Sequence, residues 1–320
     1  MKYSLSTQQK NTYPIRLLCQ VLGVSRPCYY HHRRQMANTR EGCEHRDMLE
    51  WIKANDEWSA PSDGSRRMKN ALNGLGYSVS RKKVRQLMRE AGVAVRCRKK
   101  DNVTTNSHHT PPRFANVRQR QFSVSQPDHV YAADLTYVWT QEGWFYLAVV
   151  IDLCSRKVVG WSMSSRMKAR LVGDAFKMAL GQRRPQAGLI HHSDRGAQYA
   201  SHAFRRVLGT HGVRGSMSRQ GDCWDKAVVE HFFGRLKQDR VPWRHDQTRQ
   251  EAQQDILQDI AMFYNRDRLH STLGYSSPHD FEKQFGAREK VASLGGSKTL
   301  TRSKVSDTRG AIDLNRVAHG

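Results

Sequence analysis

Residues 130–163 read VYAADLTYVWTQEGWFYLAVVIDLCSRKVVGWSM and contain three apolar runs separated by two short polar turns. The runs cover residues 130–138, 144–153 and 157–163, and the turns lie at 141–143 and 155–156. Runs of this length, rich in Val, Ile, Tyr, Phe and Trp and bounded by turn residues, are typical of strands. The segment therefore predicts an antiparallel three-stranded meander.

Downstream of this meander, helical and strand-like patterns alternate. Helical periodicity over 169–180 and 201–211 flanks a short apolar run at 189–193, and a further strand is predicted near 213–217. Helices are expected over about 226–240 and 248–267, after a polar stretch at 218–225 that we expect to be mobile. Three antiparallel strands followed by alternating elements predict a mixed α/β sheet with helices on both faces, over residues 128–285.

The part before the sheet is predicted to be helical. Residues 1–60 form an N-terminal helical region, in which 17–26 is a weak helix-turn-helix signature with Ser25 as a helix cap. Residues 61–100 form a firmer helical hairpin, with Ser80 capping its second helix and Gly76 and Gly92 ending the two helices. The apolar positions of this hairpin recur at helical spacing and are Met68, Ala71, Leu72, Leu75, Val84, Leu87, Met88 and Ala91.

The charge of the chain is strongly basic. Its 53 Lys and Arg outnumber 29 Asp and Glu, so the formal net charge is +24. The solvent face of the second hairpin helix is almost wholly cationic, and a polyanionic partner follows from that imbalance. We expect DNA contact through Arg66, Arg67, Arg81, Lys82, Lys83, Arg85 and Arg89, although an ordinary hairpin with a solvated basic face remains an alternative.

The remaining segments carry little chemistry. Residues 101–127 are polar and contain prolines, which predicts a linker, and residues 286–320 lack periodicity, which predicts a disordered tail. The six cysteines form no C-x-x-C pair. With no signal peptide and no long apolar run, we expect a reduced, cytoplasmic protein without membrane spans.

Three acids stand out because of their surroundings. Asp134 lies inside an apolar strand, Asp194 ends the run at 189–193, and Glu230 lies on an amphipathic helix with 35 residues between it and Asp194. Burying a carboxylate in an apolar strand is costly unless a cation joins it. Three converging oxygen donors are what hard divalent cations bind, so we expect a metal site made of these acids.

In a basic protein, such a site is suited to phosphodiester chemistry. Two Mg²⁺ (or Mn²⁺) ions held by these acids activate an oxygen nucleophile and stabilise the leaving oxygen of an in-line displacement. Lys237 shares a helix face with Glu230 and is a candidate phosphate contact. His192, or His191, is expected to contact phosphate or to support the acids from behind, and Asp152 is interpreted as structural because it precedes a tight turn.

The motifs around these acids resemble a known family. Asp134-Leu-Thr-Tyr137, His192-Ser-Asp-Arg-Gly-x-Gln-Tyr199 and Cys223-Trp-Asp-x-Ala-x-x-Glu-x-Phe-Phe233 are similar to the OrfB transposases of the insertion-sequence-3 family, with D,D-35-E cores. The run at 143–161, the motif at 264–278 and Gly64-x-Arg-Arg67 also match, so the resemblance covers about residues 10–285.

The resemblance implies a ribonuclease-H-like catalytic core and a catalytic, metal-binding triad of Asp134, Asp194 and Glu230. It also implies cleavage at the ends of a bacterial insertion sequence, followed by attack of the exposed 3′-hydroxyl on a second phosphodiester. The implied partners are the DNA of element ends and target, an upstream-frame protein joined by frameshifting, and further copies of the chain on DNA.

Other interpretations stay open. A DNA-binding regulator with an inert α/β domain would not need three metal-sharing acids, so its activity would survive Asp194→Asn. A retroviral-type integrase would carry a His-His-Cys-Cys zinc module, and the cysteine spacing offers none. A plain ribonuclease would lack the basic helical region. A decayed, inactive copy is a further alternative, because Lys226 stands where the family usually has Asn and the tail has no counterpart.

Overall fold

The computed structural model describes residues 13–59, 63–95, 124–218, 227–239 and 248–294. These residues divide into two compact units. One contains the residues up to 56 together with 68–94, and the other contains 57–67 together with the described residues from 95 onward. None of the described helices is long and apolar enough to cross a membrane.

The first unit is helical, as predicted. Its elements are α2 (Ile15–Val21), α3 (Arg26–Ser59), α4 (Ser65–Gly74) and α5 (Arg81–Glu90), with the end of α3 and the start of α4 falling in the second unit. The two predicted serine caps are present: the Ser25 hydroxyl oxygen accepts from the backbone N–H of Cys28 at 3.2 Å, and that of Ser80 accepts from Lys83 at 3.2 Å. Each serine satisfies an N–H group that the first helical turn leaves unpaired.

The core of this unit comes from one side of each helix. The buried side chains from α3, α4 and α5 are Met48, Ile52, Met68, Leu72, Val84, Leu87 and Met88. Their spacing of three and four residues is the one that the sequence predicted for α4 and α5. Burial of this stripe leaves the opposite side of α5 facing water.

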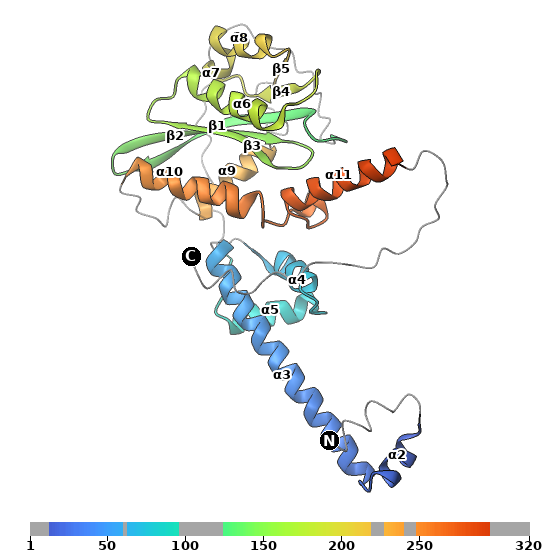
Figure 1. The fold of residues 1–320 in the computed structure, drawn as a ribbon. Coiled ribbons are helices and arrows are strands. Elements are labelled where there is room, and N and C mark those ends of the chain that lie inside the picture. Colours follow the sequence, from blue (N-terminus) through green and yellow to red (C-terminus); the bar gives the residue numbers. More distant parts are fainter. Residues whose placement is uncertain (1–12, 60–62, 96–123, 219–226, 240–247, 295–320) are drawn as a thin grey trace. The chain divides into compact units, whose positions relative to one another are not determined.

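The second unit is built on a five-stranded sheet (Figure 1). Strands β1 (Val130–Thr140), β2 (Gly143–Asp152) and β3 (Val158–Ser164) form the predicted antiparallel meander, while β4 (Ile190–Ser193) and β5 (Arg214–Met217) run parallel to β1. The strand order is β3-β2-β1-β4-β5. This mixed sheet, with helices on both faces, confirms the predicted fold class.

Alternation along β1 separates two apolar cores. Tyr131 and Ala133 point to the core shared with α6 (Ala169–Arg183), α7 (Ala197–Ala200) and α8 (His202–Thr210), whereas Ala132 and Val138 point to the core shared with α9 (Ala227–Asp239) and α10 (Arg249–Gln258). Figure 1 shows these two groups of helices on opposite sides of the sheet. Even-numbered residues of β1 therefore face α9, which fixes the side on which Asp134 lies.

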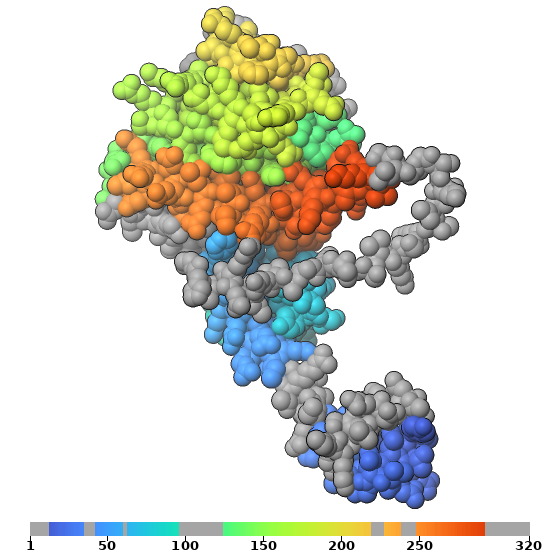
Figure 2. Space-filling model, viewed as in Figure 1, coloured from blue at the N-terminus to red at the C-terminus, as the bar shows by residue number. Residues whose placement is uncertain are grey.

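Three features of the second unit differ from the sequence-based expectations. The helix expected over 248–267 is α10 followed by a π-helical turn, η2 (Asp259–Tyr264), and the short helix α7 was not predicted. The boundary between core and tail, expected at 285/286, falls inside α11 (Pro278–Leu294), which continues the chain in helical form. In the space-filling view, α10 and α11 form a continuous band over the lower part of this unit (Figure 2). The expected mobile stretch at 218–225, apart from Ser218, and most of the expected linker lie outside the described residues.

Gly160 on β3 allows the closest approach between the sheet and α6. A Cβ built at this position would lie 2.3 Å from the backbone oxygen of Ala175 and 2.8 Å from the Cβ of Ala179. We therefore expect Gly160→Ala to lower the free energy of unfolding by about 2–3 kcal/mol, because the helix backbone must move away from the sheet. Chemical denaturation measures this change.

Gly181 is the matched control. It lies on α6, the helix that Gly160 of β3 approaches, and a Cβ at position 181 would meet no atom within 4 Å. Gly181→Ala is expected to be neutral or to stabilise by about 0.5–1 kcal/mol, as alanine does in a helix. Equal effects of the two substitutions would contradict the close approach.

Candidate active site

Asp134 and Asp194 leave the sheet at the same level. The parallel pairing of β1 with β4 matches Val130 with Ile190 and Ala132 with His192. Continuing that register by two residues brings Asp134 opposite Asp194, the residue that directly follows Ser193 at the end of β4. By this extended register, the two acids that the sequence predicted to share one edge of the sheet lie at the same level of neighbouring strands.

The side chain of Asp134 lies on the face covered by α9. It pairs across β1 and β2 with Val149, and Val149 belongs to the core that α9 helps to form. One of its carboxylate oxygens accepts a hydrogen bond from the backbone N–H of Leu135 at 2.9 Å. This bond limits the rotation of a carboxylate that is only partly buried.

Asp194 is oriented by the turn that follows it. The Oδ1 atom accepts a hydrogen bond from the backbone N–H of Gly196 at 2.8 Å, and a Cβ at residue 196 would stand 2.8 Å from that same oxygen. A side chain at 196 would therefore push the carboxylate aside. This contact gives a physical reason for glycine in the Asp194-Arg-Gly196 sequence.

The hydroxyl of Tyr199 reports the negative potential that the two acids create. Tyr199 is almost fully buried on α7, and its oxygen has no hydrogen-bond partner among the described residues. Burial raises the pKa of this hydroxyl well above its usual value of 10, and the charges of Asp134 and Asp194 raise it further. Both carboxylates therefore lie near enough to the Tyr199 hydroxyl to raise its pKa.

Glu230 approaches from the helix on the same side. It lies exposed in the first turn of α9, whose opposite side buries Val229, Phe232, Phe233 and Leu236 against the sheet. Within the described ranges, no three His, Cys, Asp or Glu side chains are close enough to hold a metal ion. The segment that leads into α9, residues 219–226 with Lys226, lies outside those ranges.

The two histidines before Asp194 are both buried. His191 packs against the rings of Phe176, Tyr199 and Phe204, and burial lowers its pKa to about 3, with a smaller contribution from His192. His192 is 1% exposed, and its Nδ1 lies 3.0 Å from the hydroxyl of Ser216 on β5. This burial contradicts the predicted contact of His192 with DNA, because β4 lies between β1 and β5 and the side chain has no exposed surface. The alternative prediction, that the histidine supports the acids from inside the fold, fits its position.

Asp152 has the structural position that its place before a tight turn suggested. It is fully buried at the end of β2 and accepts hydrogen bonds from the backbone N–H groups of Asp128 (3.2 Å) and Ser155 (2.8 Å). The Ser155 hydroxyl donates a third bond at 2.7 Å. These bonds stabilise the turn between β2 and β3, so the carboxylate of Asp152 has a structural role.

A buried ion pair behind the site was missed by sequence reasoning. Arg235 of α9 and Asp259 of η2 are buried, and their side chains form two parallel hydrogen bonds, one of them 3.0 Å from Nη1 to Oδ1. The guanidinium also lies 5.4–5.8 Å from the ring centres of Phe232, Phe263 and Tyr264. One signal was available: Arg235 stands three residues after Phe232 and next to Leu236, on the apolar side of its helix.

The predicted DNA contacts are exposed to different degrees. On α5, Arg81, Lys82, Arg85 and Arg89 are exposed and Lys83 is half-buried, while Arg66 of α4 is exposed. Arg67 is paired with Asp63 at 3.3 Å, so part of its charge serves that contact. Lys237 of α9 lies 4.5 Å above the ring of Tyr137, three residues beyond Asp134 on β1.

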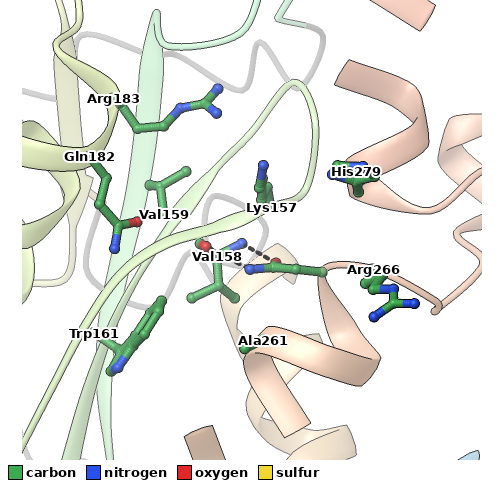
Figure 3. Close-up of a pocket in the computed structure, with 10 residues that line it drawn as sticks. Lys157, Val158, Val159, Trp161, Gln182, Arg183, Ala261, Arg266 and His279 are labelled. Atoms are coloured by element: carbon green, nitrogen blue, oxygen red, sulfur yellow. Dashed lines mark hydrogen bonds between the residues drawn. The ribbon is translucent and has the colours of Figure 1, made fainter. Parts of the chain in front are cut away.

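A separate pocket lies at the other edge of the sheet (Figure 3). It has a volume of about 380 Å³ and is lined by residues of β3, α6, η2 and the start of α11, among them Lys157, Trp161, Arg183 and His279. In Figure 3, dashed lines mark the two hydrogen bonds between Asn265 and the backbone of Val158, one from the Val158 N–H (2.9 Å) and one to its carbonyl (3.0 Å). None of Asp134, Asp194 and Glu230 lines this pocket, so it is distinct from the candidate active site.

The chain is similar in sequence to integrase core domains and to insertion-sequence proteins. Models of an integrase core domain match residues 124–223 and 211–278, and an HTH-like domain matches residues 45–101. The "Insertion element IS600 uncharacterized 31 kDa protein" of Shigella sonnei is 40% identical over 84% of this chain and 98% of its own length. "Transposase InsF for insertion sequence IS3A" of Escherichia coli (strain K12) is 36% identical over 89% of this chain and 99% of its own length. Among solved structures, the catalytic core domain of BIV integrase is 19% identical with a TM-score of 0.38, over 51% of this chain and 99% of that one.

Proposed function

The chain belongs to the IS3 family of transposases, and we propose that Asp134, Asp194 and Glu230 are the acids with which it cuts and rejoins DNA. The chain is a DDE-type transposase with an integrase core and an HTH-like DNA-binding domain. Cores of this superfamily use divalent metal in general. Our proposal is that these three residues hold the metal in this chain, and that the metal consists of two Mg²⁺ or Mn²⁺ ions.

The observation that carries the proposal is the common level of Asp134 and Asp194 on β1 and β4. The charges of both acids also raise the pKa of the buried Tyr199 hydroxyl, which supports their closeness to one another. Carboxylate oxygens are the ligands that Mg²⁺ prefers, in small numbers and with substrate phosphates completing its coordination. The donor set of these residues therefore fits the ion.

Each residue of the proposed site has a defined task. Asp134 and Asp194 would hold metal with carboxylates that the N–H groups of Leu135 and Gly196 orient. Glu230 would complete the set from α9. Bound divalent ions supply the activation of the attacking oxygen and the stabilisation of the leaving one.

A cleavage assay tests this proposal. The full chain, alone or fused to the product of its upstream frame, is incubated with labelled element ends in Mg²⁺ or in chelator. Strand cleavage is expected only with metal, and Asp134→Asn and Asp194→Asn are each expected to abolish it while DNA binding is retained. Cleavage by either variant at the rate of the original protein would overturn the assignment.

We further propose that the exposed face of α5 binds DNA phosphates. Each phosphate contact contributes about −0.9 to the slope of log K against log salt concentration. The double substitution Arg85→Ala/Arg89→Ala is therefore expected to reduce this slope by about 2, with weaker binding at low salt. Fluorescence anisotropy of a labelled element end, measured at several salt concentrations, gives the slope.

Arg170→Ala is the matched control, because Arg170 on α6 is also exposed (88% of its side chain) but lies outside the HTH-like domain. An equal loss of slope in this variant would mean that any exposed arginine contributes, and would remove the special role of α5.

We also propose the partners that such a reaction requires. Two element ends must be brought together, which favours a homo-oligomer assembled on DNA, and the upstream-frame protein would join the chain as a frameshift fusion. The proposed location is the bacterial cytoplasm at the nucleoid. Light scattering of the protein–DNA complex, with and without the fused upstream product, measures the number of copies.

A further inference from the structure

An aromatic cluster lies at the tip of the β1–β2 hairpin. Tyr137, Trp139 and Trp144 are 41%, 57% and 46% exposed, which is unusual for side chains of this size. Trp139 faces Trp144 directly across the two strands. The three rings therefore form one surface on a single face of the hairpin.

The rings meet edge to face and not in a stack. The ring centres of Tyr137 and Trp144 are 5.1 Å apart with planes at 89°, and those of Trp139 and Trp144 are 4.8 Å apart at 75°. In this arrangement the rings do not cover one another face to face. Flat ring surface is thus left for another flat group to stack on.

The hairpin that carries the rings is held firmly. Glu142 in its turn accepts two hydrogen bonds from Arg249 at the start of α10, one at 2.6 Å from the guanidinium and one at 3.1 Å from the backbone N–H. The Thr140 hydroxyl donates to the carbonyl of Gly143 at 2.8 Å across the turn. The aromatic cluster is therefore preorganised.

Two elements connect the cluster to the proposed metal-binding acids. Tyr137 lies three residues beyond Asp134, about 10 Å along β1, and the two side chains leave opposite faces of the strand. Lys237 lies seven residues beyond Glu230, about 10 Å along the same face of α9. The two paths meet where the Lys237 ammonium lies 4.5 Å above the Tyr137 ring.

We propose that Tyr137, Trp139 and Trp144 form a stacking platform for unpaired DNA bases next to the bond that is cut, with Lys237 holding the adjoining phosphate. The inference rests on the proposed function, since it takes its position from Asp134 and Glu230. Stacking on aromatic rings requires an open base face, which an intact duplex covers with its neighbours. The occupant is therefore one to three bases at a frayed or cut element end.

Charge and chemistry favour nucleic acid over a protein partner here. The chain carries a formal charge of +24, and a cation beside exposed aromatic rings is the combination that binds single-stranded nucleic acid without reading its sequence. The platform would hold the terminal bases apart and so keep the scissile phosphate accessible to the acids.

The test uses the full chain in chelator, so that no strand is cut, and element ends that carry 2-aminopurine at each of the three positions beside the scissile phosphate. Binding is expected to quench the fluorescence of at least one position by stacking. Trp139→Leu/Trp144→Leu is expected to remove this quenching and to weaken the binding of an end with unpaired bases about tenfold, with little effect on a fully paired end.

Trp139→Phe/Trp144→Phe is the matched control, since it keeps flat rings and is expected to keep most of the quenching. Thermal unfolding verifies that both variants fold. Unchanged quenching in the leucine variant overturns the platform. So does a leucine variant that binds both ends normally but loses a protein–protein contact in light scattering, because the surface would then be an interface between chains.

The assay separates this inference from the assignment of the acids. Asp194→Asn is expected to retain the quenching, because stacking needs no metal. Quenching together with cleavage that survives in the acid variants would retain the platform and overturn the triad. Normal cleavage that depends on the acids, without any quenching, would retain the triad and overturn the platform.

Discussion

Replacing Glu230 by glutamine is expected to slow strand cleavage by about 10³-fold or more while DNA binding stays within about twofold. Glutamine keeps the size of the side chain and removes its negative charge, which is the property that a divalent cation requires. Glu230 is exposed on α9, so the substitution removes no packing from the core. A loss of cleavage would therefore report chemistry and not unfolding.

Glu289→Gln provides the matched control, because Glu289 is an exposed helical glutamate on α11 far along the chain from the three acids. It is expected to cleave at the original rate. Initial rates on labelled element ends, at saturating protein, give the comparison. A Glu230→Gln rate within tenfold of the control would remove Glu230 from the catalytic set.

The second large effect is expected at the buried ion pair behind α9. Asp259→Asn would leave the guanidinium of Arg235 without its charged partner, enclosed by aromatic rings at 5% exposure of its side chain. Breaking a buried pair on one side costs about 3–5 kcal/mol of unfolding free energy. For a unit of this size we expect Tm to fall by about 10 °C, measured by calorimetry.

Two further variants isolate the cause. Asp174→Asn breaks the exposed pair with Arg170 on α6, and its expected cost is below about 1 kcal/mol. Replacing both partners, as Arg235→Met/Asp259→Leu, is expected to restore most of the lost stability because no charge is left buried. If Asp259→Asn cost no more than Asp174→Asn, the pair would not contribute in this way.

The strands could be predicted because burial on both faces leaves a plain signature. The continuous apolar runs of β1 and β2 and the turns between them specified the meander to within about one residue at most ends. The serine caps of α3 and α5 could also be predicted, since a capping side chain acts on its own first turn. Local chemistry decides these features, so local sequence reveals them.

Features that depend on distant contacts could not be predicted. The π-helical turn η2 places Asp259 against Arg235, which is 24 residues away in sequence, and no local pattern encodes that meeting. His192 was a candidate for DNA contact because it closely precedes Asp194, but the pairing of β4 with both β1 and β5 buries it. The extension of α11 past residue 285 was missed because its last turns carry little apolar periodicity.

The candidate site was predictable in part for the same reason. The apolar contexts of Asp134 and Asp194 identified both acids, and parallel pairing of β1 and β4 brings them to one level. The contribution of Glu230 depends on how α9 lies over the sheet and on the residues that lead into it. Its participation stays a prediction until the rate of Glu230→Gln is measured.

The hydrogen bonds of Asn265 to the backbone of Val158 bear on unwanted association between copies of this protein. β3 is the outermost strand on its side of the sheet, and an outermost strand is a template on which another chain can add a strand of its own. The Asn265 amide occupies both the N–H and the carbonyl of Val158, so one side chain takes the place of a neighbouring strand at that point. In the homo-oligomer proposed above, where copies would be crowded on DNA, this capping of Val158 would oppose the addition of a strand from another copy.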